Sequence, residues 1–367
     1  MALYPQLILD ALKHVRYPGN GVDVVTASMV DDNIRIEGNK VSFSLLLDKP
    51  NDPFAKSLVK ASEQAILTYV GKEVDIVGNI GINYKTQLPP QPEKLLPQVK
   101  NIIAVSSGKG GVGKSTVSSN LAVALANEGY KVGLLDADIF GPSVPKMFGL
   151  EDARPYLEPV EGRELIRPEE KYGVKMLSIG FFVSPTTATL WRGGMATSAL
   201  KQLIADADWG ELDYFILDTP PGTSDIHLTL LQTLPITGAV IVSTPQQVAL
   251  ADARKGIDMY RNEKVNVPIL GLIENMAWFT PAELPGNRYY IFGREGCKQL
   301  AEEMKVPLLA QIPLVQSICE NGDQGTPAAL NSETATGLAY INLAQAVVTV
   351  VNRRNSELPK TKIVGVK

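Results

Sequence analysis

A nine-residue glycine-rich segment limits the folds open to this chain more than any other feature. It follows an apolar run at 102–106, opens a segment with helical spacing of apolar residues, and reads Gly108-Lys109-Gly110-Gly111-Val112-Gly113-Lys114-Ser115-Thr116. Glycines let successive backbone N–H groups face a single anion, and the N-terminus of the following helix adds positive potential at that point. A strand, this loop and a helix, in that order, form the context in which the P-loop motif cradles the phosphates of a nucleotide.

The motif predicts a task for each of its polar side chains. Lys114 is expected to reach the β- and γ-phosphates, Ser115 to ligate Mg²⁺, and Thr116 to meet the α-phosphate. The backbone from Gly108 to Gly113 is expected to cradle the phosphates. The sequence therefore predicts ATP and Mg²⁺ as ligands, with slow ATP hydrolysis that serves as a switch.

Three aspartates stand at the ends of predicted strands. Asp136 and Asp138 close the apolar run at 132–136, and Asp218 ends the run at 214–218. Because the C-terminal ends of parallel strands face the ligand crevice, these carboxylates are expected near the phosphates. We assign Asp218 to the Mg²⁺ shell, Asp136 to its support and Asp138 to positioning of the attacking water. Each can instead be a helix N-cap or a turn aspartate.

The order of apolar segments predicts two domains. From residue 101, short apolar strands alternate with longer helical segments, at 102–106, 132–136, 174–178, 214–218, 239–243 and 269–274. This pattern is typical of a doubly wound α/β domain with a mostly parallel sheet, which we place at 101–354. A small α+β domain is predicted at 1–84, with helices at 5–15 and from 52 or 53 to 71, and strands at 22–30, 41–47 and 74–77. A proline-rich linker at 85–100 separates the two, and a polar tail at 355–367 ends the chain.

Composition narrows the classes of partner. The 367-residue chain has a net charge of -4, which does not favour nucleic acid or an anionic membrane. No apolar run of transmembrane length and no secretion signal is evident, so we expect a cytoplasmic protein. Two cysteines and two histidines supply neither a disulfide framework nor a zinc site of usual spacing. The apolar segment at 334–351 is expected to be a core helix.

The second lysine of the motif, Lys109, brings a resemblance to a particular P-loop class. The string resembles the deviant Walker A motif of MinD, ParA and the nitrogenase iron protein. The resemblance implies that Lys109 crosses a homodimer interface and reaches the partner's nucleotide. A solvated loop lysine is the alternative.

Further segments closely resemble the Mrp (ApbC) family of iron–sulfur cluster carrier ATPases, over about residues 101–327. The segments that carry this resemblance are 136–143, 191–195, 209–214, 218–225, 244–247 and 274–276. Residues 1–84 resemble the Suf-assembly-type domain that precedes many members. The resemblance implies a P-loop dimer that delivers a [4Fe–4S] cluster to apo-proteins, with Asn275 recognising adenine and residues near Pro313 and Asp323 closing over the base. Asn275 can instead be a turn or C-cap asparagine.

The chain departs from that family at the cluster ligands. The family usually carries a C-x-x-C pair just after the Glu-Asn-Met segment, and residues 277–293 contain no cysteine. Cys297, at the mouth of a predicted helix, is the substitute ligand, because a helix N-terminus lowers a thiol pKa. Free cysteines are more often inert core, and Cys319 is expected to be packing.

Three functions stay open on the sequence. The first is a cluster carrier, and the second is a metal-free assembly or scaffold ATPase that has lost the cluster site. The third is a positioning ATPase like ParA or MinD, which requires a basic surface or an amphipathic membrane helix.

Overall fold

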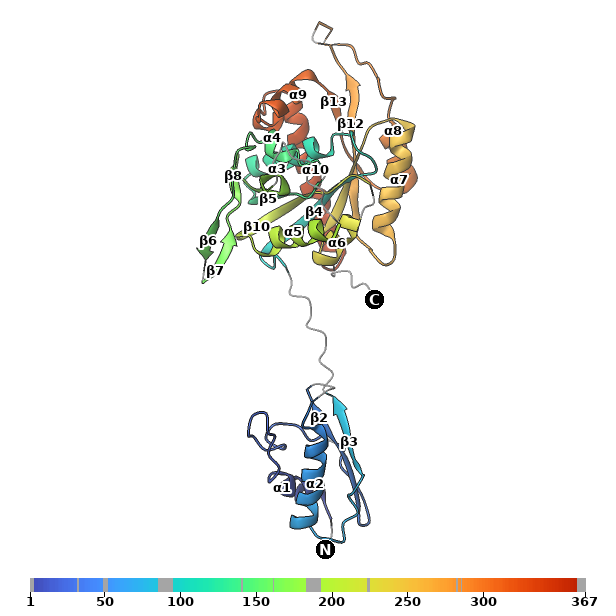
Figure 1. Cartoon of the computed structure of the whole chain (residues 1–367). Coiled ribbons are helices and arrows are strands. Elements are labelled where there is room, and N and C mark those ends of the chain that lie inside the picture. Colours follow the sequence, from blue (N-terminus) through green and yellow to red (C-terminus); the bar gives the residue numbers. More distant parts are fainter. Residues whose placement is uncertain are drawn as a thin grey trace. The chain divides into compact units, whose positions relative to one another are not determined.

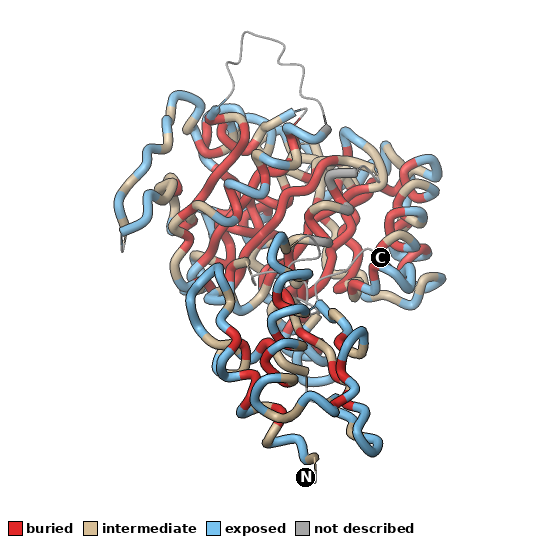
Figure 2. Tube along the Cα trace, turned by 60° about the horizontal axis from the view of Figure 1, so that its bottom comes forward, coloured by how far each residue is buried: buried red, intermediate tan, exposed pale blue. Residues whose placement is uncertain are grey.

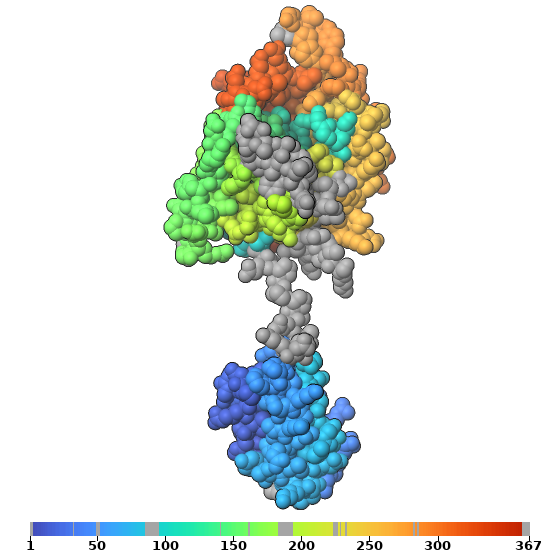
Figure 3. Space-filling view, viewed as in Figure 1, coloured from blue at the N-terminus to red at the C-terminus, as the bar shows by residue number. Residues whose placement is uncertain are grey.

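The computed structural model describes residues 3–31, 33–48, 52–84, 95–139, 141–160, 162–182, 193–222, 225–281, 283–284 and 286–361. The chain divides into two compact units, Met1–Glu93 and Lys94–Lys367. Each unit has its own buried apolar core. Figure 3 shows the surface of the first unit in blue to cyan and that of the second in teal to red.

The first unit packs two helices against a three-stranded sheet. Its elements are α1 (Pro5–Leu12), β1 (Arg35–Glu37), β2 (Lys40–Leu47), α2 (Ala55–Tyr69) and β3 (Ile80–Tyr84). The sheet order is β1-β2-β3. β1 runs antiparallel to β2, and β3 runs parallel to β2. Alternate residues of β2 are buried, which gives the sheet one apolar face.

Two strands predicted in this unit are wrong. Residues 22–30 form turns, in which Asp23 accepts hydrogen bonds from the N–H groups of Val25 and Thr26. Residues 74–77 contribute an isolated bridge at Asp75, and the strand follows at β3. An aspartate that caps its own backbone competes with a strand ladder, and the apolar pattern alone does not report that competition.

The second unit is built on an eight-stranded sheet in the order β13-β12-β11-β4-β10-β5-β9-β8. All described pairs are parallel except β8 with β9, so the predicted α/β fold class is confirmed. The strands are β4 (Val99–Ser107), β5 (Val132–Asp136), β8 (Glu169–Lys171), β9 (Val174–Ser178), β10 (Leu212–Asp218), β11 (Gly238–Ser243), β12 (Ile269–Phe279) and β13 (Leu308–Leu314). A separate hairpin pairs β6 (Leu157–Val160) with β7 (Arg163–Ile166).

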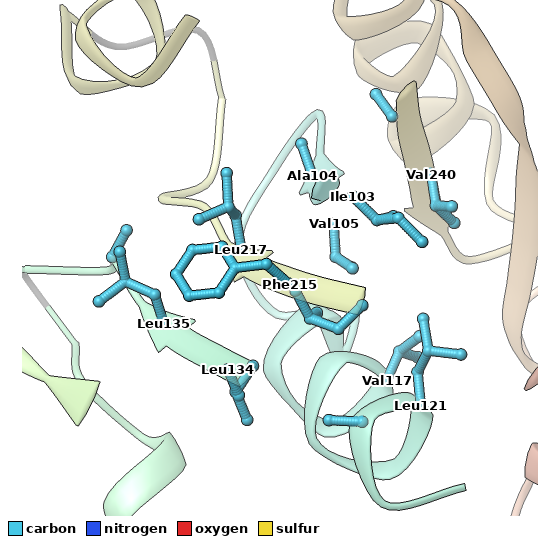
Figure 4. Packing of buried hydrophobic residues seen from close by; sticks show 14 of the residues in the cluster. Ile103, Ala104, Val105, Val117, Leu121, Leu134, Leu135, Phe215, Leu217 and Val240 are labelled. Carbon is cyan, nitrogen blue, oxygen red and sulfur yellow. The ribbon is translucent and has the colours of Figure 1, made fainter. Parts of the chain in front are cut away.

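Helices cover both faces of this sheet (Figure 1). α3 (Lys114–Asn127) and α10 (Ala335–Glu357) pack together on one face, and α5 (Gly193–Ala205), α6 (Asp225–Thr233), α7 (Gln247–Arg261) and α8 (Gly296–Met304) lie on the other. The shorter elements are α4 (Val144–Met147), α9 (Gln316–Asp323), η1 (Ile179–Phe182) and η2 (Ala328–Leu330). Burial is concentrated along the central strands (Figure 2). Val117 and Leu121 of α3 belong to the same buried core, in which the Phe215 ring lies beside Leu135 and Leu217 (Figure 4).

α10 is long and apolar enough, by length and composition, to cross a membrane. It nevertheless packs against α3, β12 and β13, and its Tyr340, Leu343 and Val347 are fully buried. These contacts confirm the predicted core helix. The helix extends to Glu357, past the predicted start of the polar tail.

Candidate nucleotide-binding site

The P-loop connects the C-terminal end of β4 to α3, at the centre of the sheet. Gly113 adopts a left-handed conformation (φ +81°) as the N-cap of α3, which places Lys114 at the first position of the helix. At Gly108, a Cβ would collide with the backbone of Asp252 and Ala253 in α7. The loop is therefore seated closely against α7, and only glycine fits at its first position.

Lys114 is a buried cation held by a carboxylate at the end of β10 and another in the loop that follows β5. Its Nζ atom donates to Asp218 Oδ1 at 2.8 Å and lies 3.8 Å from Asp138 Oδ2, and its side chain is 6% exposed. Nζ also lies 3.2 Å from Ser115 Oγ. Ser118, one turn further along α3, donates to the same Asp218 oxygen at 2.7 Å. The structure thus brings four predicted residues, Lys114, Ser115, Asp138 and Asp218, into one cluster.

One oxygen of this cluster has the character of a metal-shell ligand. Asp218 Oδ2 is buried and has no hydrogen-bond partner among the described residues. A buried carboxylate oxygen without a partner is costly, and a hydrated cation satisfies it. The hydroxyl of Ser115 lies in the same cluster. The donor set is the carboxylate-and-hydroxyl oxygen chemistry that Mg²⁺ prefers.

Asp136 orders the neighbouring segment. Its Oδ1 accepts from the Asp138 N–H at 3.1 Å, and its Oδ2 accepts from Ser178 Oγ at 3.0 Å and from the Val144 N–H at 3.3 Å. Burial, together with the nearby Asp218 carboxylate, raises the pKa of Asp136 to about 8. Both oxygens are engaged by the protein, so Asp136 acts on Asp138 through the backbone in this structure.

Two neighbouring cavities lie around the P-loop. The first, of about 250 Å³, is lined by the glycines of the loop with Lys114, Ser115, Thr116 and Asp138. The second, of about 440 Å³, is lined by Asn275, Pro313, Cys319 and Asp323. Gly113, Thr116, Ser143 and Met147 line both. Asn275 donates from Nδ2 to the Val112 carbonyl oxygen at 2.8 Å, so its amide is already anchored to the P-loop.

The two cysteines do not form an accessible pair of cluster ligands, because one is buried and the other is exposed. Cys297 is fully buried at the start of α8, where its N–H donates to Glu274 Oε2 at 2.7 Å. Burial and the Glu274 carboxylate raise the pKa of its thiol, so the expected lowering by the helix N-terminus is wrong.

Cys319 is exposed at the second cavity, with Sγ 3.9 Å from Asp323 Oδ2, so its expected packing role is also wrong. Among the described residues, no three His, Cys, Asp or Glu side chains form a metal-binding group.

β12 continues past the sheet into a hairpin arm, which we define by its described residues, 278–281, 283–284 and 286–292. Phe279 and Tyr289 exchange two backbone hydrogen bonds of 2.8 Å at its base. The Arg288 guanidinium lies over the Trp278 ring, 4.2 Å from its centroid. This arm occupies the position at which the sequence resemblance predicts a C-x-x-C pair, and it presents aromatic and arginine side chains there instead.

Sequence reasoning missed two polar residues of the site. Ser118 stands four positions after Lys114, so the helical period itself places it on the same face. His227 belongs to none of the motifs analysed in the sequence, and the structure buries it against Ser106 and Thr219. No local pattern predicts that contact, because it joins α6 to two strand ends. Trp191 and Arg192, which stood out in the sequence, lie outside the described residues.

Two family models match the chain. The model of the NUBPL iron-transfer P-loop NTPases, named ParA, matches residues 98–348, and that of an iron–sulfur cluster assembly protein matches residues 5–77. The chain is 42% identical to the iron–sulfur cluster carrier protein of Synechocystis sp., over 94% of this chain and 97% of that protein. It is 48% identical to the protein of the same name from Escherichia coli, over 71% and 69% of the two chains.

Solved structures agree with the fold. The nucleotide-binding protein of Archaeoglobus fulgidus in complex with ADP is 38% identical, with a TM-score of 0.54 over 62% of this chain and 87% of that chain. The septum site-determining protein MinD of Pyrococcus horikoshii, complexed with Mg-ADP, is 25% identical, with a TM-score of 0.51 over 70% of this chain and 98% of that chain.

Proposed function

The chain belongs to the family of NUBPL iron-transfer P-loop NTPases, and from this premise we propose that it is a homodimeric ATPase that delivers iron–sulfur clusters to apo-proteins in the cytoplasm. The observation that carries the ATPase part is the burial of the Lys114 ammonium between Asp218 and Asp138 at the wall of the P-loop cavity. A cation and carboxylates held in this way are the parts that phosphoryl transfer uses.

Each polar residue of the cluster has a separate task in this proposal. Lys114 leaves Asp218 and binds the β- and γ-phosphates, while the loop backbone holds their oxygens. Ser115 and Asp218 hold Mg²⁺, which neutralises charge that develops on the phosphates. Asp138, oriented by Asp136, positions the attacking water. Asn275 faces the base from the second cavity.

The proposed homodimer depends on Lys109. Its backbone carbonyl accepts from Ser107 Oγ at 2.9 Å, which fixes the loop, and its ammonium has no ion-pair partner among the described residues. In the proposal this ammonium reaches the nucleotide of the partner protomer, so that ATP closes the dimer and hydrolysis opens it.

The test of the ATPase is steady-state hydrolysis by the full chain, with two lysine variants beside it. We expect slow turnover in the wild type. Lys114→Ala should abolish nucleotide binding, whereas Lys109→Ala should bind nucleotide in each protomer and fail to form the ATP-dependent dimer. Hydrolysis by Lys109→Ala at the wild-type rate, without a dimer, would contradict the shared site.

A metal-free assembly ATPase is the second candidate, and the burial of Cys297 favours it. With Cys297 enclosed, each protomer exposes one cysteine, Cys319, among the described residues. Two thiolates per dimer are half of the usual ligand set of a cubane cluster. The cysteines of a dimer therefore supply no exposed set of four thiolates for a cubane cluster.

Anaerobic reconstitution separates the two candidates. Iron and sulfide are counted per dimer for the wild type, for Cys319→Ala and for Cys297→Ala/Cys319→Ala. About four irons per dimer that disappear in the double variant would establish a carrier. No cysteine-dependent iron in a folded protein that hydrolyses ATP would establish the metal-free function.

A further inference from the structure

His227 is a buried histidine with no task in the chemistry above. Its side chain is 1% exposed, and its Nε2 atom is 3.0 Å from Thr219 Oγ1 and 3.2 Å from Ser106 Oγ. Ser106 stands two residues before Gly108, and Thr219 directly follows Asp218. His227 thus joins α6 to the ends of both strands that carry the nucleotide site.

The hydrogen bonds of Thr219 decide which imidazole nitrogen carries the proton. The Thr219 hydroxyl donates to the Val105 carbonyl oxygen at 3.0 Å, and a hydroxyl has a single proton to donate. Its oxygen is then an acceptor for His227, and the tautomer that matches this arrangement carries its proton on Nε2. Burial, with Lys114 nearby, lowers the pKa of His227 to about 4, so the ring is neutral at physiological pH.

The segment that His227 holds is also tied to the P-loop. The Thr219 N–H donates to the Val105 carbonyl at 3.1 Å, and the Gly222 N–H donates to the Ser107 carbonyl at 2.9 Å. The Tyr260 ring of α7 meets the imidazole edge-on, with centroids 6.4 Å apart, and limits its rotation. These contacts leave the Thr219 side chain, and with it the adjacent Asp218, little freedom once the Nε2–H bond is made.

We infer that His227 is a positioning residue for ATP hydrolysis, whose Nε2–H donates to Thr219 and thereby fixes the Asp218 carboxylate beside Lys114. The inference rests on the function proposed above. It predicts that the donor, rather than the ring or its charge, is the required feature. Glutamine places an N–H donor at a similar distance from the backbone, and leucine fills similar space without one.

The test compares His227→Gln with His227→Leu in the full chain. We expect His227→Leu to lower kcat by about tenfold or more, with the KM for ATP within about threefold of the wild type. His227→Gln should restore kcat to within about threefold of the wild type. Equal loss in both variants, or a loss that appears in KM alone, would overturn the inference.

A double-mutant cycle ties the effect to Thr219. Thr219→Val removes the acceptor, so His227→Leu/Thr219→Val should lose no more activity than the more damaged single variant. Additive losses would show that the two side chains act separately. Tyr340→Phe is the control for a buried polar change, because the Tyr340 hydroxyl has no described hydrogen-bond partner, and its kcat should equal that of the wild type.

A binding measurement decides the inference even without turnover. The affinity for a non-hydrolysable ATP analogue is measured with and without Mg²⁺, because Asp218 is the proposed shell residue. We expect Mg²⁺ to tighten binding in the wild type and in His227→Gln, and to do so about two- to threefold less in His227→Leu, in line with the small change expected in its KM. A wild type that binds the analogue but never hydrolyses ATP would refute the proposed ATPase alone. Equal Mg²⁺ dependence in all three proteins would refute the role of His227.

Discussion

At the scale of single residues, the site gathers buried charged groups that are paired within the protein, except for one oxygen of Asp218. Lys114 has Asp218 and Asp138 as partners, and Asp136 is satisfied by a serine and two backbone N–H groups. Burying an ammonium is tolerable only with such partners. The charges that the phosphates and Mg²⁺ would rearrange are therefore already collected at one point.

Asp138→Asn should bind ATP with near wild-type affinity and hydrolyse it about 100-fold more slowly. The amide keeps the size of the side chain but cannot orient water as a carboxylate does. Single-turnover hydrolysis, measured beside equilibrium binding of the analogue, checks both parts. Wild-type turnover in this variant would remove Asp138 from the water-positioning role.

Acid should destabilise the nucleotide-free protein through His227. The pKa of His227 is about 4 in the folded chain, against 6.5 for a histidine exposed to water. A lowered folded-state pKa contributes stability that is present above pH 6.5 and is lost as the pH falls toward 4. Between pH 7 and pH 5 the wild type should therefore lose about 2 kcal/mol more of its unfolding free energy than His227→Gln. Urea unfolding at the two pH values measures this difference, and parallel losses would contradict it.

The residues of the P-loop cluster could be predicted because one local motif and the ends of parallel strands bring them together. The chemistry of Cys297 could not. The helix N-terminus is visible in the sequence and favours the thiolate, but burial and the Glu274 carboxylate act against it and prevail. Those two influences arise from contacts across the sheet, which no local spacing reports.

At the scale of elements, apolar runs predicted the central strands well. The strands at 132–136 and 174–178 have their predicted bounds, because both are buried strands with neighbours on each side. β13 was missed, since Pro313 and Gln311 interrupt its apolar pattern. It lies at the edge of the sheet, where a proline is tolerated.

Gly108→Ala should weaken nucleotide binding because the P-loop is seated on α7. The added methyl would meet the backbone of Asp252 and Ala253, and such overpacking costs about 1–3 kcal/mol. Gly256→Ala, within α7 itself, is the matched control: its Cβ would meet nothing within 4 Å, and alanine favours a helix. For the first variant alone, the calorimetric Kd for ADP should rise and the melting temperature should fall. Equal affinity in both variants would show that the loop moves independently of α7.

At the scale of the whole molecule, each unit has a separate core. The first is formed by α1, α2 and its three-stranded sheet, and the second by the eight-stranded sheet and its helices. Sequence reasoning reached the presence of two folded parts from the proline-rich segment between them. The proposed dimerisation and cluster transfer involve a second molecule, and the sequence predicts them only through its resemblance to a known family.

Residues 94–367 alone should bind ADP with a Kd within about threefold of that of the full chain, since both cavities and their walls belong to this unit. Titration calorimetry on the truncated and the full chains measures the comparison. A truncated chain that melts as cooperatively as the full chain, yet binds ADP much more weakly, would show that the first unit contributes to the nucleotide site.

The arm has a consequence for how chains of this architecture can be remade. It leaves the sheet at Phe279, and the Phe279–Tyr289 pair closes its base, while Asn275 on the same strand lines the second cavity. No described residue between Phe279 and Tyr289 lines either cavity. Substitutions in this part of the arm, such as the introduction of cysteines, should therefore leave the lining of both cavities unaltered.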